Sequence, residues 1–360
     1  MDLSAARAGR YARAAVRWAR LLLSRGSRHR AAGIRVFYGH DRVPEPGEPV
    51  AGGSAKIQRL AARFPNRPDD FSIAYLGSNW VPRDLALFLR YLRRRRIPLV
   101  VNQDGVGYPG WAGADTETVN GPLRALLGAA DHVLYQSEFC KRAADEWVGP
   151  CAGSWEILYN AVDVSRFMPV EQPAPDGPVL LLGGDQTQAY RLELALETLA
   201  ALVPTQPDAR LLVTGRVVGP IEPAVARLRL EGRVHALGRY SQADAPAIFR
   251  RAHLLLHTKV NDPCPSVVIE AMATGLPVVY ARSGGVPELV GDDAGVGVPH
   301  PDGFERDEPP GAEAFADAVS RVLGNLRDYG AAARARAVEQ FSLEPWLDRH
   351  AELFERLAPR

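Results

Sequence analysis

Cysteine is scarce in this 360-residue chain, which contains three, Cys140, Cys151 and Cys264. Three scattered thiols are too few for a disulfide framework or a cysteine metal site. No apolar run reaches the roughly 18 residues of a membrane-spanning helix, and the N-terminus lacks the apolar core of a signal peptide. These shortages predict a protein that folds in the reducing cytoplasm.

A large excess of charge of one sign is also missing from the chain as a whole. The net charge is +1, and 46% hydrophobic with 24% charged residues describes an ordinary globular protein. Because near-neutrality gives no general attraction to nucleic acid, we expect no nucleic-acid partner. The length suggests two domains, each able to bury a core.

Positive charge is nevertheless concentrated in residues 1–33, which hold eight arginines and one aspartate. Arg10, Arg13 and Arg17 share one side of a helical wheel, whereas Trp18 and nearby leucines share another. This basic amphipathic helix has two open interpretations. It attaches peripherally to the anionic inner face of a membrane, or it packs on the protein body with its charges in water.

A helix is predicted between two apolar strand-like runs in the segment from 253 to 291. Pro265 suits the first turn, Gly275 suits the residue just past the end, and Pro277 prevents continuation. The helix therefore runs roughly from Pro265 to Thr274. Its residues are apolar nearly all round, which predicts that it is buried.

The first turn of this helix is predicted to bind phosphate. The amides of Ser266, Val267 and Val268 lack intrahelical partners, and the helix dipole adds partial positive charge. The Glu270 carboxylate leans back towards this end, and Asp262 approaches it from the preceding loop. Two carboxylates beside an anion are tolerated where they bind neutral hydroxyl groups. A nucleotide sugar, with a diphosphate between two polyols, fits this arrangement.

Asp262 and Glu270 are separated by seven residues and are followed by ATGLPVV and SGGVPELV. This pattern resembles the Glu-x7-Glu signature of retaining GT-B glycosyltransferases, particularly glycosyltransferase family 4. The resemblance implies that Glu270 binds the ribose diol and that Asp262, one methylene shorter than the usual glutamate, lies by the donor sugar. The alternative interpretation, which does not use the resemblance, is that Glu270 is a core carboxylate with its hydrogen bonds satisfied and that Asp262 is an ordinary loop residue.

Strand-like runs alternate with helical patterns from residue 34 onward, which is typical of a parallel α/β sheet. The resemblance implies a GT-B fold with two Rossmann-like doubly wound domains facing a cleft. We expect five parts: a basic extension (1–33), an acceptor-side domain (34–165), a proline-rich linker (166–178), a nucleotide-sugar-binding domain (179–342) and a C-terminal helix that crosses back to the first domain (343–360).

Candidate residues in the first domain follow from the rule that ligands bind beyond the carboxyl ends of parallel strands. Gln103 and Asp104 end the third predicted strand and are catalytic candidates with Asp262. Family members commonly have a His-Asp pair here, so no histidine role transfers to Gln103, and Asp104 either acts on substrate or caps the loop. Gly53 resembles the family's glycine-rich turn against donor phosphates, and Lys56 serves phosphate or faces solvent.

The second domain opens with a strand, a glycine pair that includes Gly184, and a long helix that contains Arg191. The resemblance implies an Arg and a Lys that neutralise the diphosphate. Arg191 fits the second position, but Asp185 occupies the first, so another cation must substitute. Lys259 is the candidate, and its alternative is an exposed loop lysine.

The predicted reaction transfers a sugar from a nucleotide-diphosphate donor to an unidentified acceptor, and the resemblance implies retention of configuration. The helix amides, Arg191 and Lys259 would stabilise charge on the departing diphosphate. No Asp-x-Asp follows a predicted strand, so we expect neither metal nor cofactor. One alternative is a nucleotide-sugar epimerase or phosphorylase. The other is a catalytically silent partner protein that binds a sugar nucleotide, and this second alternative is suggested by Asp185, Gln103 and the short Asp262.

Overall fold

The computed structural model describes residues 33–45, 48, 53–82, 84–169, 177–301 and 303–358, together with Val16. The predicted amphipathic helix and most of the predicted linker lie outside these residues, so membrane attachment stays a prediction. None of the described helices has the length and hydropathy needed to cross a bilayer. The chain divides into two compact units, Met1–Pro46 with Ala51–Leu158 and Leu347–Arg360, and Gly47–Val50 with Tyr159–Trp346.

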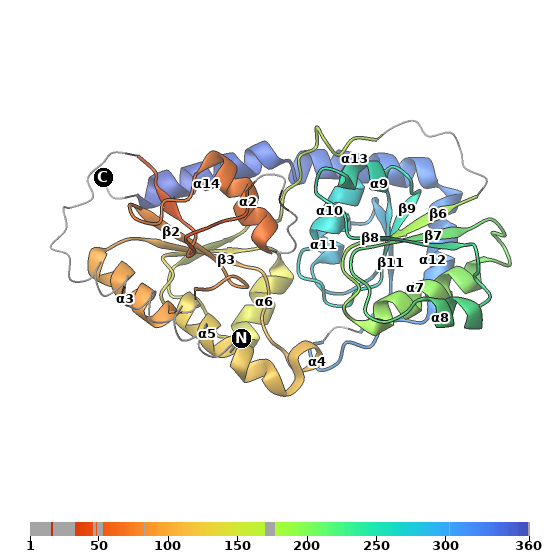
Figure 1. The fold of residues 1–360 in the computed structure, drawn as a ribbon, viewed down its shortest axis with the longest axis horizontal. Helices are drawn as coiled ribbons and strands as arrows, with labels where there is room; N and C mark the ends of the chain where they lie inside the picture. The colour runs from red at the N-terminus through yellow and green to blue at the C-terminus, as the bar shows by residue number, and fades with distance from the viewer. Residues whose placement is uncertain are drawn as a thin grey trace, which may run out of the picture. The chain divides into compact units, whose positions relative to one another are not determined.

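The first unit contains a five-stranded parallel sheet (Figure 1). Its strands are β1 (Val36–Phe37), β2 (Ile73–Gly77), β3 (Leu99–Gln103), β4 (His132–Tyr135) and β5 (Ser154–Ile157). Strands β2, β3 and β4 are buried along their whole length because helices cover both faces. The described strands pair in chain order, since each crossover advances in the same direction. The parallel α/β class is confirmed, but no doubly wound reversal is found among the described strands of this unit.

Helices of the first unit lie on both sides of this sheet. They are α2 (Gly53–Arg63), α3 (Leu85–Arg95), α4 (Pro109–Ala112), the 3₁₀ turn η1 (Gly113–Asp115), α5 (Thr116–Leu127) and α6 (Glu138–Trp147). The helix α14 (Leu343–Leu357) contributes its residues from Leu347 onward. Helices α2 and α14 lie on one side and α3 and α5 on the other (Figure 1). Phe354 of α14 is fully buried, with its ring centroid 6.0 Å from that of Tyr75.

An ion pair joins α14 to the edge strand β5. Glu156 Oε2 accepts a hydrogen bond from Arg349 Nε at 2.9 Å, and Glu156 Oε1 lies 3.0 Å from His132 Nε2. Burial by itself raises the pKa of Glu156, but the hydrogen bonds from His132 and Arg349 outweigh burial and lower the pKa to about 2. Because an unfolded chain restores the ordinary pKa of 4.5, Glu156 stabilises the fold above that pH. This contribution is lost as the pH falls from 4.5 towards 2.

We expect Glu156→Gln to lower the urea midpoint of unfolding at pH 7 and to lower it less at pH 3. The matched control is Glu352→Gln, because Glu352 pairs with the same Arg349 at 2.7 Å but its side chain is 65% exposed. An exposed pair contributes little, so this control should change the midpoint only slightly at either pH. Equal losses at pH 7 and pH 3 for Glu156→Gln would contradict the assigned pKa.

The second unit contains a six-stranded parallel sheet in the order β11-β10-β9-β6-β7-β8. The strands are β6 (Val179–Leu182), β7 (Arg210–Thr214), β8 (Val234–Gly238), β9 (Leu254–His257), β10 (Val278–Ala281) and β11 (Gly295–Val298). The chain runs outward from β6 to β8, returns to place β9 beside β6, and then runs outward the other way. The predicted doubly wound arrangement is therefore confirmed here, with its topological switch point between β6 and β9.

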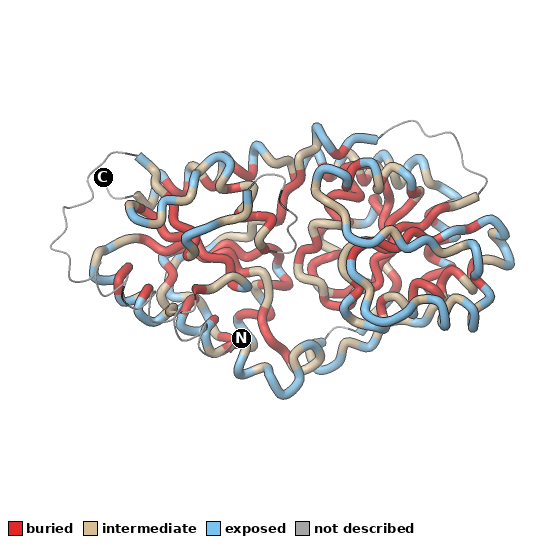
Figure 2. The backbone as a smooth tube through the Cα atoms, viewed as in Figure 1, coloured by how far each residue is buried: buried red, intermediate tan, exposed pale blue. Residues whose placement is uncertain are grey.

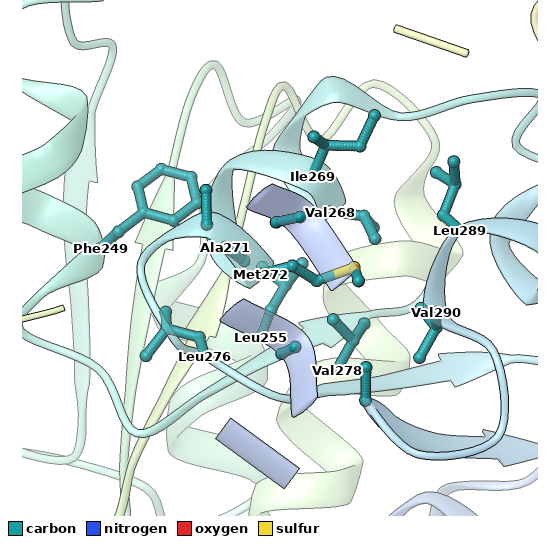
Figure 3. Packing of buried hydrophobic residues seen from close by; sticks show 14 of the residues in the cluster. Phe249, Leu255, Val268, Ile269, Ala271, Met272, Leu276, Val278, Leu289 and Val290 are labelled. Carbon is teal, nitrogen blue, oxygen red and sulfur yellow. The ribbon is translucent and has the colours of Figure 1, made fainter. Parts of the chain in front are cut away.

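Two apolar clusters cover the two faces of this sheet, and buried positions follow its strands (Figure 2). One face packs against α9 (Ala245–Phe249), α10 (Ser266–Ala273), α11 (Val286–Val290) and α13 (Leu326–Gln340). The other packs against α7 (Ala189–Leu202) and α12 (Ala312–Gly324), with α8 (Glu222–Arg227) at its margin. Figure 3 shows α10 surrounded by this packing, with Met272 close to Leu255 and Val278. The predicted burial of α10 is confirmed.

The bounds of α10 agree with its predicted helix signals to within one residue at each end. Pro265 is the N-cap and Thr274 the C-cap. Gly275 adopts φ +79°, and the amides of Gly275 and Leu276 donate to the carbonyls of Met272 and Ala271. These bonds form a Schellman motif, which requires the left-handed conformation that glycine adopts without strain.

Candidate functional site

The switch point brings two glycines against the tip of α10. A side-chain carbon at Gly183 would overlap Cγ2 of Val267, so the end of β6 packs directly on the first turn of the helix. Gly184 has φ +80° and open space where a side chain would project. The backbone after β6 is therefore close to the helix tip and accessible beside it, as the predicted role of Gly184 requires.

The helix tip presents two unpaired amides where three were predicted. Val268 N donates to the carbonyl of the N-cap residue Pro265 at 3.1 Å, which is a 3₁₀-type bond across the first turn. The prediction for Val268 was therefore wrong. The amides of Ser266 and Val267 have no acceptor in the described chain. Glu270 lies one turn further along the helix and is 3% exposed.

Asp262 lies between a lysine and a histidine. Its Oδ1 is 3.2 Å from Lys259 Nζ, and its Oδ2 is 3.4 Å from His257 Nε2. Burial opposes ionisation of Asp262, but Lys259 and His257 outweigh it and hold the pKa of the carboxyl well below its usual range. Burial lowers the pKa of His257, which favours its neutral form. Sequence reasoning treated His257 only as the end of a strand, although strand ends were the available signal for finding it.

The loop that carries Asp262 is held by the segment after β10. Asn261 has φ +52°, and its amide donates to Ser283 Oγ at 3.0 Å. Gly285 N donates to the Asp262 carbonyl at 2.9 Å. Gly284 has φ +67°, and a side-chain carbon there would lie 2.6 Å from the same carbonyl oxygen. Gly284 of SGGVPELV thus lets the backbone approach closely enough to position Asp262.

Arg191 is buried beneath the loop after β6. Its Nη1 donates to the Asp185 carbonyl at 2.6 Å, and its Nη2 donates to the Gly183 carbonyl at 3.4 Å. Burial lowers the pKa of Arg191, although the nearby Asp262 carboxylate opposes this change. The guanidinium therefore holds the backbone of the loop that contains the glycine pair. Its direct contact with a phosphate stays a prediction.

Lys259, the predicted substitute for a cation at position 185, and Arg239, which lies near Asp185, differ in their contacts. Lys259 is 28% exposed and pairs with Asp262, so it is a partly exposed loop residue with an ion-pair partner. Asp185 Oδ1 accepts from Arg216 N at 2.7 Å, and its Oδ2 lies 3.4 Å from Arg239 Nη2. Arg239 belongs to the GRYS loop after β8, where sequence reasoning gave it no role.

In the first unit, the structure brings Asp104 and Lys56 together at the carboxyl ends of β2 and β3. Lys56 Nζ donates to Asn102 Oδ1 at 2.6 Å and to Asp104 Oδ2 at 3.2 Å. Ser78 Oγ donates to Asp104 Oδ1, and Asp104 N donates back to Ser78 Oγ at 3.0 Å. Lys56 is 3% exposed, so its solvent-facing interpretation is wrong.

Gln103 and Gly53 lie near this cluster along the chain. Gln103 is fully buried, and its Nε2 donates to the Gly105 carbonyl at 2.6 Å. Gly53 is the first residue of α2, and a side-chain carbon there would overlap the Asn79 amide. Gln103 is therefore fixed towards the chain interior, and Gly53 is required for close packing at the start of the helix. Their substrate contacts stay predictions.

Residues 177–325 match the family model described as Glycosyl transferases group 1. The chain is 21% identical over 244 residues to the phosphatidylinositol N-acetylglucosaminyltransferase gpi3 subunit of Schizosaccharomyces pombe. The aligned residues cover 66% of this chain and 51% of that protein. This chain spans about half the length of the curated relatives that it matches first.

Two solved structures share the fold. Sucrose-phosphate synthase from Thermosynechococcus elongatus aligns with a TM-score of 0.69 at 19% identity, covering 90% of this chain and 98% of that one. Anabaena HepE in complex with UDP-glucose aligns with a TM-score of 0.63 at 19% identity, covering 84% of this chain and 81% of that one. By its fold the chain is a GT-B protein, and its residues 177–325 match the family described as Glycosyl transferases group 1.

Proposed function

We propose that this protein transfers a sugar, with retention of configuration and without a metal ion, from a nucleotide-diphosphate donor to an acceptor that the sequence does not identify. The tip of α10 is the observation that carries the proposal. Two unpaired amides at a helix N-terminus lie at the switch point of a doubly wound sheet, where such sheets bind ligands. Glu270 and Asp262 supply carboxylates from the same helix and from the loop before it.

Each carboxylate has a proposed partner on the donor. Glu270 accepts hydrogen bonds from the ribose diol, because a carboxylate accepts strong hydrogen bonds from hydroxyl groups. Asp262 accepts from a donor-sugar hydroxyl while Lys259 and His257 keep its carboxylate ionised and oriented. The amides of Ser266 and Val267 bind the diphosphate, with Gly184 leaving room for it and Arg191 supporting the loop from below.

The proposed chemistry needs no strong protein base, since the departing diphosphate accepts the acceptor proton. The positive end of α10 and nearby cations stabilise the charge that develops on the leaving group. Asp104, Gln103 and Gly53 are proposed to border the substrates in the first unit. The contacts of Asp104 with Lys56 and Ser78 support a positioning role for it more than proton transfer.

The ligands of the structural neighbour HepE suggest which donor nucleotides to test first. HepE has been crystallised with UDP, with UDP and glucose, and with UDP-glucose. This supports uridine diphosphate sugars as the first donors to test here, with guanosine and adenosine diphosphate sugars beside them.

We expect the purified chain to be stabilised thermally by one class of nucleotide sugar and to release the nucleoside diphosphate from it when a cell extract supplies acceptors. A ligand that binds only the folded state raises the melting temperature by mass action. Turnover should persist in excess EDTA, with a metal-dependent transferase as the positive control for chelation. Loss of turnover with EDTA, restored by a divalent cation, would disprove metal independence.

A second candidate function is a catalytically silent partner that binds a sugar nucleotide. It is favoured by Gln103 and Asp104, which both make hydrogen bonds within the first unit. Donor binding without transfer or hydrolysis in the presence of acceptor extract would favour this alternative. Product that retains the anomeric configuration of the donor, determined by NMR, would support the transferase with retention.

A further inference from the structure

Three loops at the carboxyl ends of β6, β7 and β8 are joined beside the proposed diphosphate site. A side-chain carbon at Gly215 would overlap the Gly184 carbonyl, so the loops after β6 and β7 are in direct contact. Gly215 N donates to the Gly238 carbonyl at 2.8 Å, which connects the loop after β7 to that after β8. Arg239, the next residue, completes the connection by approaching Asp185.

The residue after Arg239 extends this loop towards α10. Tyr240 packs against the apolar cluster that contains α10. Burial raises the pKa of the Tyr240 phenol, and the neighbouring Glu270 carboxylate raises it further. Arg239 therefore belongs to a loop that contacts the site on two sides, through Asp185 at the switch point and through Tyr240 near Glu270.

The cations near the helix tip differ in how many of their donors are already used. Arg191 is buried and donates to two backbone carbonyls, and Lys259 pairs with Asp262. Arg239 is 69% exposed, and its 3.4 Å pairing with Asp185 uses one of five guanidinium N–H groups. An exposed pair of this kind exchanges partners at little free-energy cost. A planar guanidinium with free donors is well suited to bind two phosphate oxygens.

We propose that Arg239 binds the diphosphate of the donor and that Asp185 is a positioning residue that holds the guanidinium beside the helix tip. The proposal rests on the proposed function, because it needs a nucleoside diphosphate at α10. It also answers how a carboxylate is accommodated at position 185, next to an anion. The charge of Asp185 is offset by Arg239, and a donor phosphate then shares the guanidinium with it.

The test compares nucleoside diphosphates with monophosphates by calorimetry, using UDP, GDP and ADP with UMP, GMP and AMP. For the base that binds best, Arg239→Ala should weaken diphosphate binding about tenfold and monophosphate binding less than twofold, the former corresponding to about 1.4 kcal/mol. The control Arg233→Ala changes an arginine at the amino end of the same strand, whose Nη1 donates to the Pro207 carbonyl, and should change neither affinity.

A rescue variant guards against a purely structural effect. Asp185→Arg in the Arg239→Ala background restores a guanidinium at the same place and should recover most of the diphosphate affinity, and Arg239→Lys should recover part of it. Equal loss of diphosphate and monophosphate affinity, or no loss, would overturn the role of Arg239 while leaving the proposed function intact. A wild-type chain that binds none of the diphosphates would overturn both.

Discussion

Gly284→Ala is expected to lower kcat/KM for sugar transfer by about a hundredfold and to destabilise the protein by about 2 kcal/mol or more. Position 284 has φ +67°, a conformation that costs a non-glycine residue about 1–2 kcal/mol. A side-chain carbon there would also lie 2.6 Å from the Asp262 carbonyl oxygen. The loop that carries the Asp262 carboxylate must therefore move.

The control for this prediction is Gly219→Ala. Gly219 has φ +87°, so it has a comparable conformational cost, but nothing lies within 4 Å of where its side chain would begin. We expect this variant to lose some thermal stability and to keep most of its kcat/KM. If Gly284→Ala and Gly219→Ala lose activity equally, the contact with Asp262 is not what the reaction depends on.

Glu270→Ala is expected to weaken nucleoside diphosphate binding by about 1–3 kcal/mol, because the ribose hydroxyl groups lose their acceptor. Glu270 is 3% exposed within a packed helix, so alanine also leaves a cavity. Glu270→Gln keeps the volume and removes the charge, and is therefore the variant for the specific test. Calorimetry with the ribonucleoside diphosphate and its 2′,3′-dideoxy analogue measures the contribution of the diol.

The wild-type chain should prefer the ribose form, and Glu270→Gln should lose most of that preference without a large change in melting temperature. A variant that binds the dideoxy analogue less well, to the same extent as the ribose form, would show that Glu270 acts through the packing of α10. An unchanged preference would remove Glu270 from the ribose site.

The sequence predicted the second unit better than the first because its local signals are stronger. Pro265, Gly275 and Pro277 mark both ends of α10 through backbone chemistry that needs no distant partner. The switch between β6 and β9 follows from alternating strands and helices together with the family resemblance. In the first unit, the same alternation indicates a parallel sheet but does not determine whether the strand order reverses.

Residues of the candidate site were predictable where their chemistry depends on neighbours in sequence. Asp262 lies in the loop before α10 and Glu270 lies within α10, so their places in the fold follow from the predicted bounds of that helix. Lys56 contacts Asp104 across 48 positions, and Arg239 contacts Asp185 across 54. Such pairs depend on which strands are adjacent and on side-chain conformations, neither of which a single sequence specifies.

Tertiary context also changed two local expectations. The rule for the first turn of a helix predicted an unpaired Val268 amide, but the Pro265 carbonyl accepts its hydrogen bond. Lys259 was considered either a phosphate ligand or an exposed residue; the structure pairs it with Asp262, and its contact with phosphate stays a prediction. In both cases the deciding contact lies within three residues. For Lys259, the partner Asp262 belongs to the loop that Ser283 and Gly285 hold.

The discontinuous composition of the first unit has a consequence for biosynthesis. Tyr75 on β2 is buried partly by Phe354, and residues 347–358 emerge from the ribosome only after all of 159–346 has been made. The face of the first sheet that this helix covers therefore stays incompletely buried until the entire second unit has been synthesised. That second unit is nearly continuous in sequence and holds its own core, so it can reach its native packing before the earlier-made half is complete.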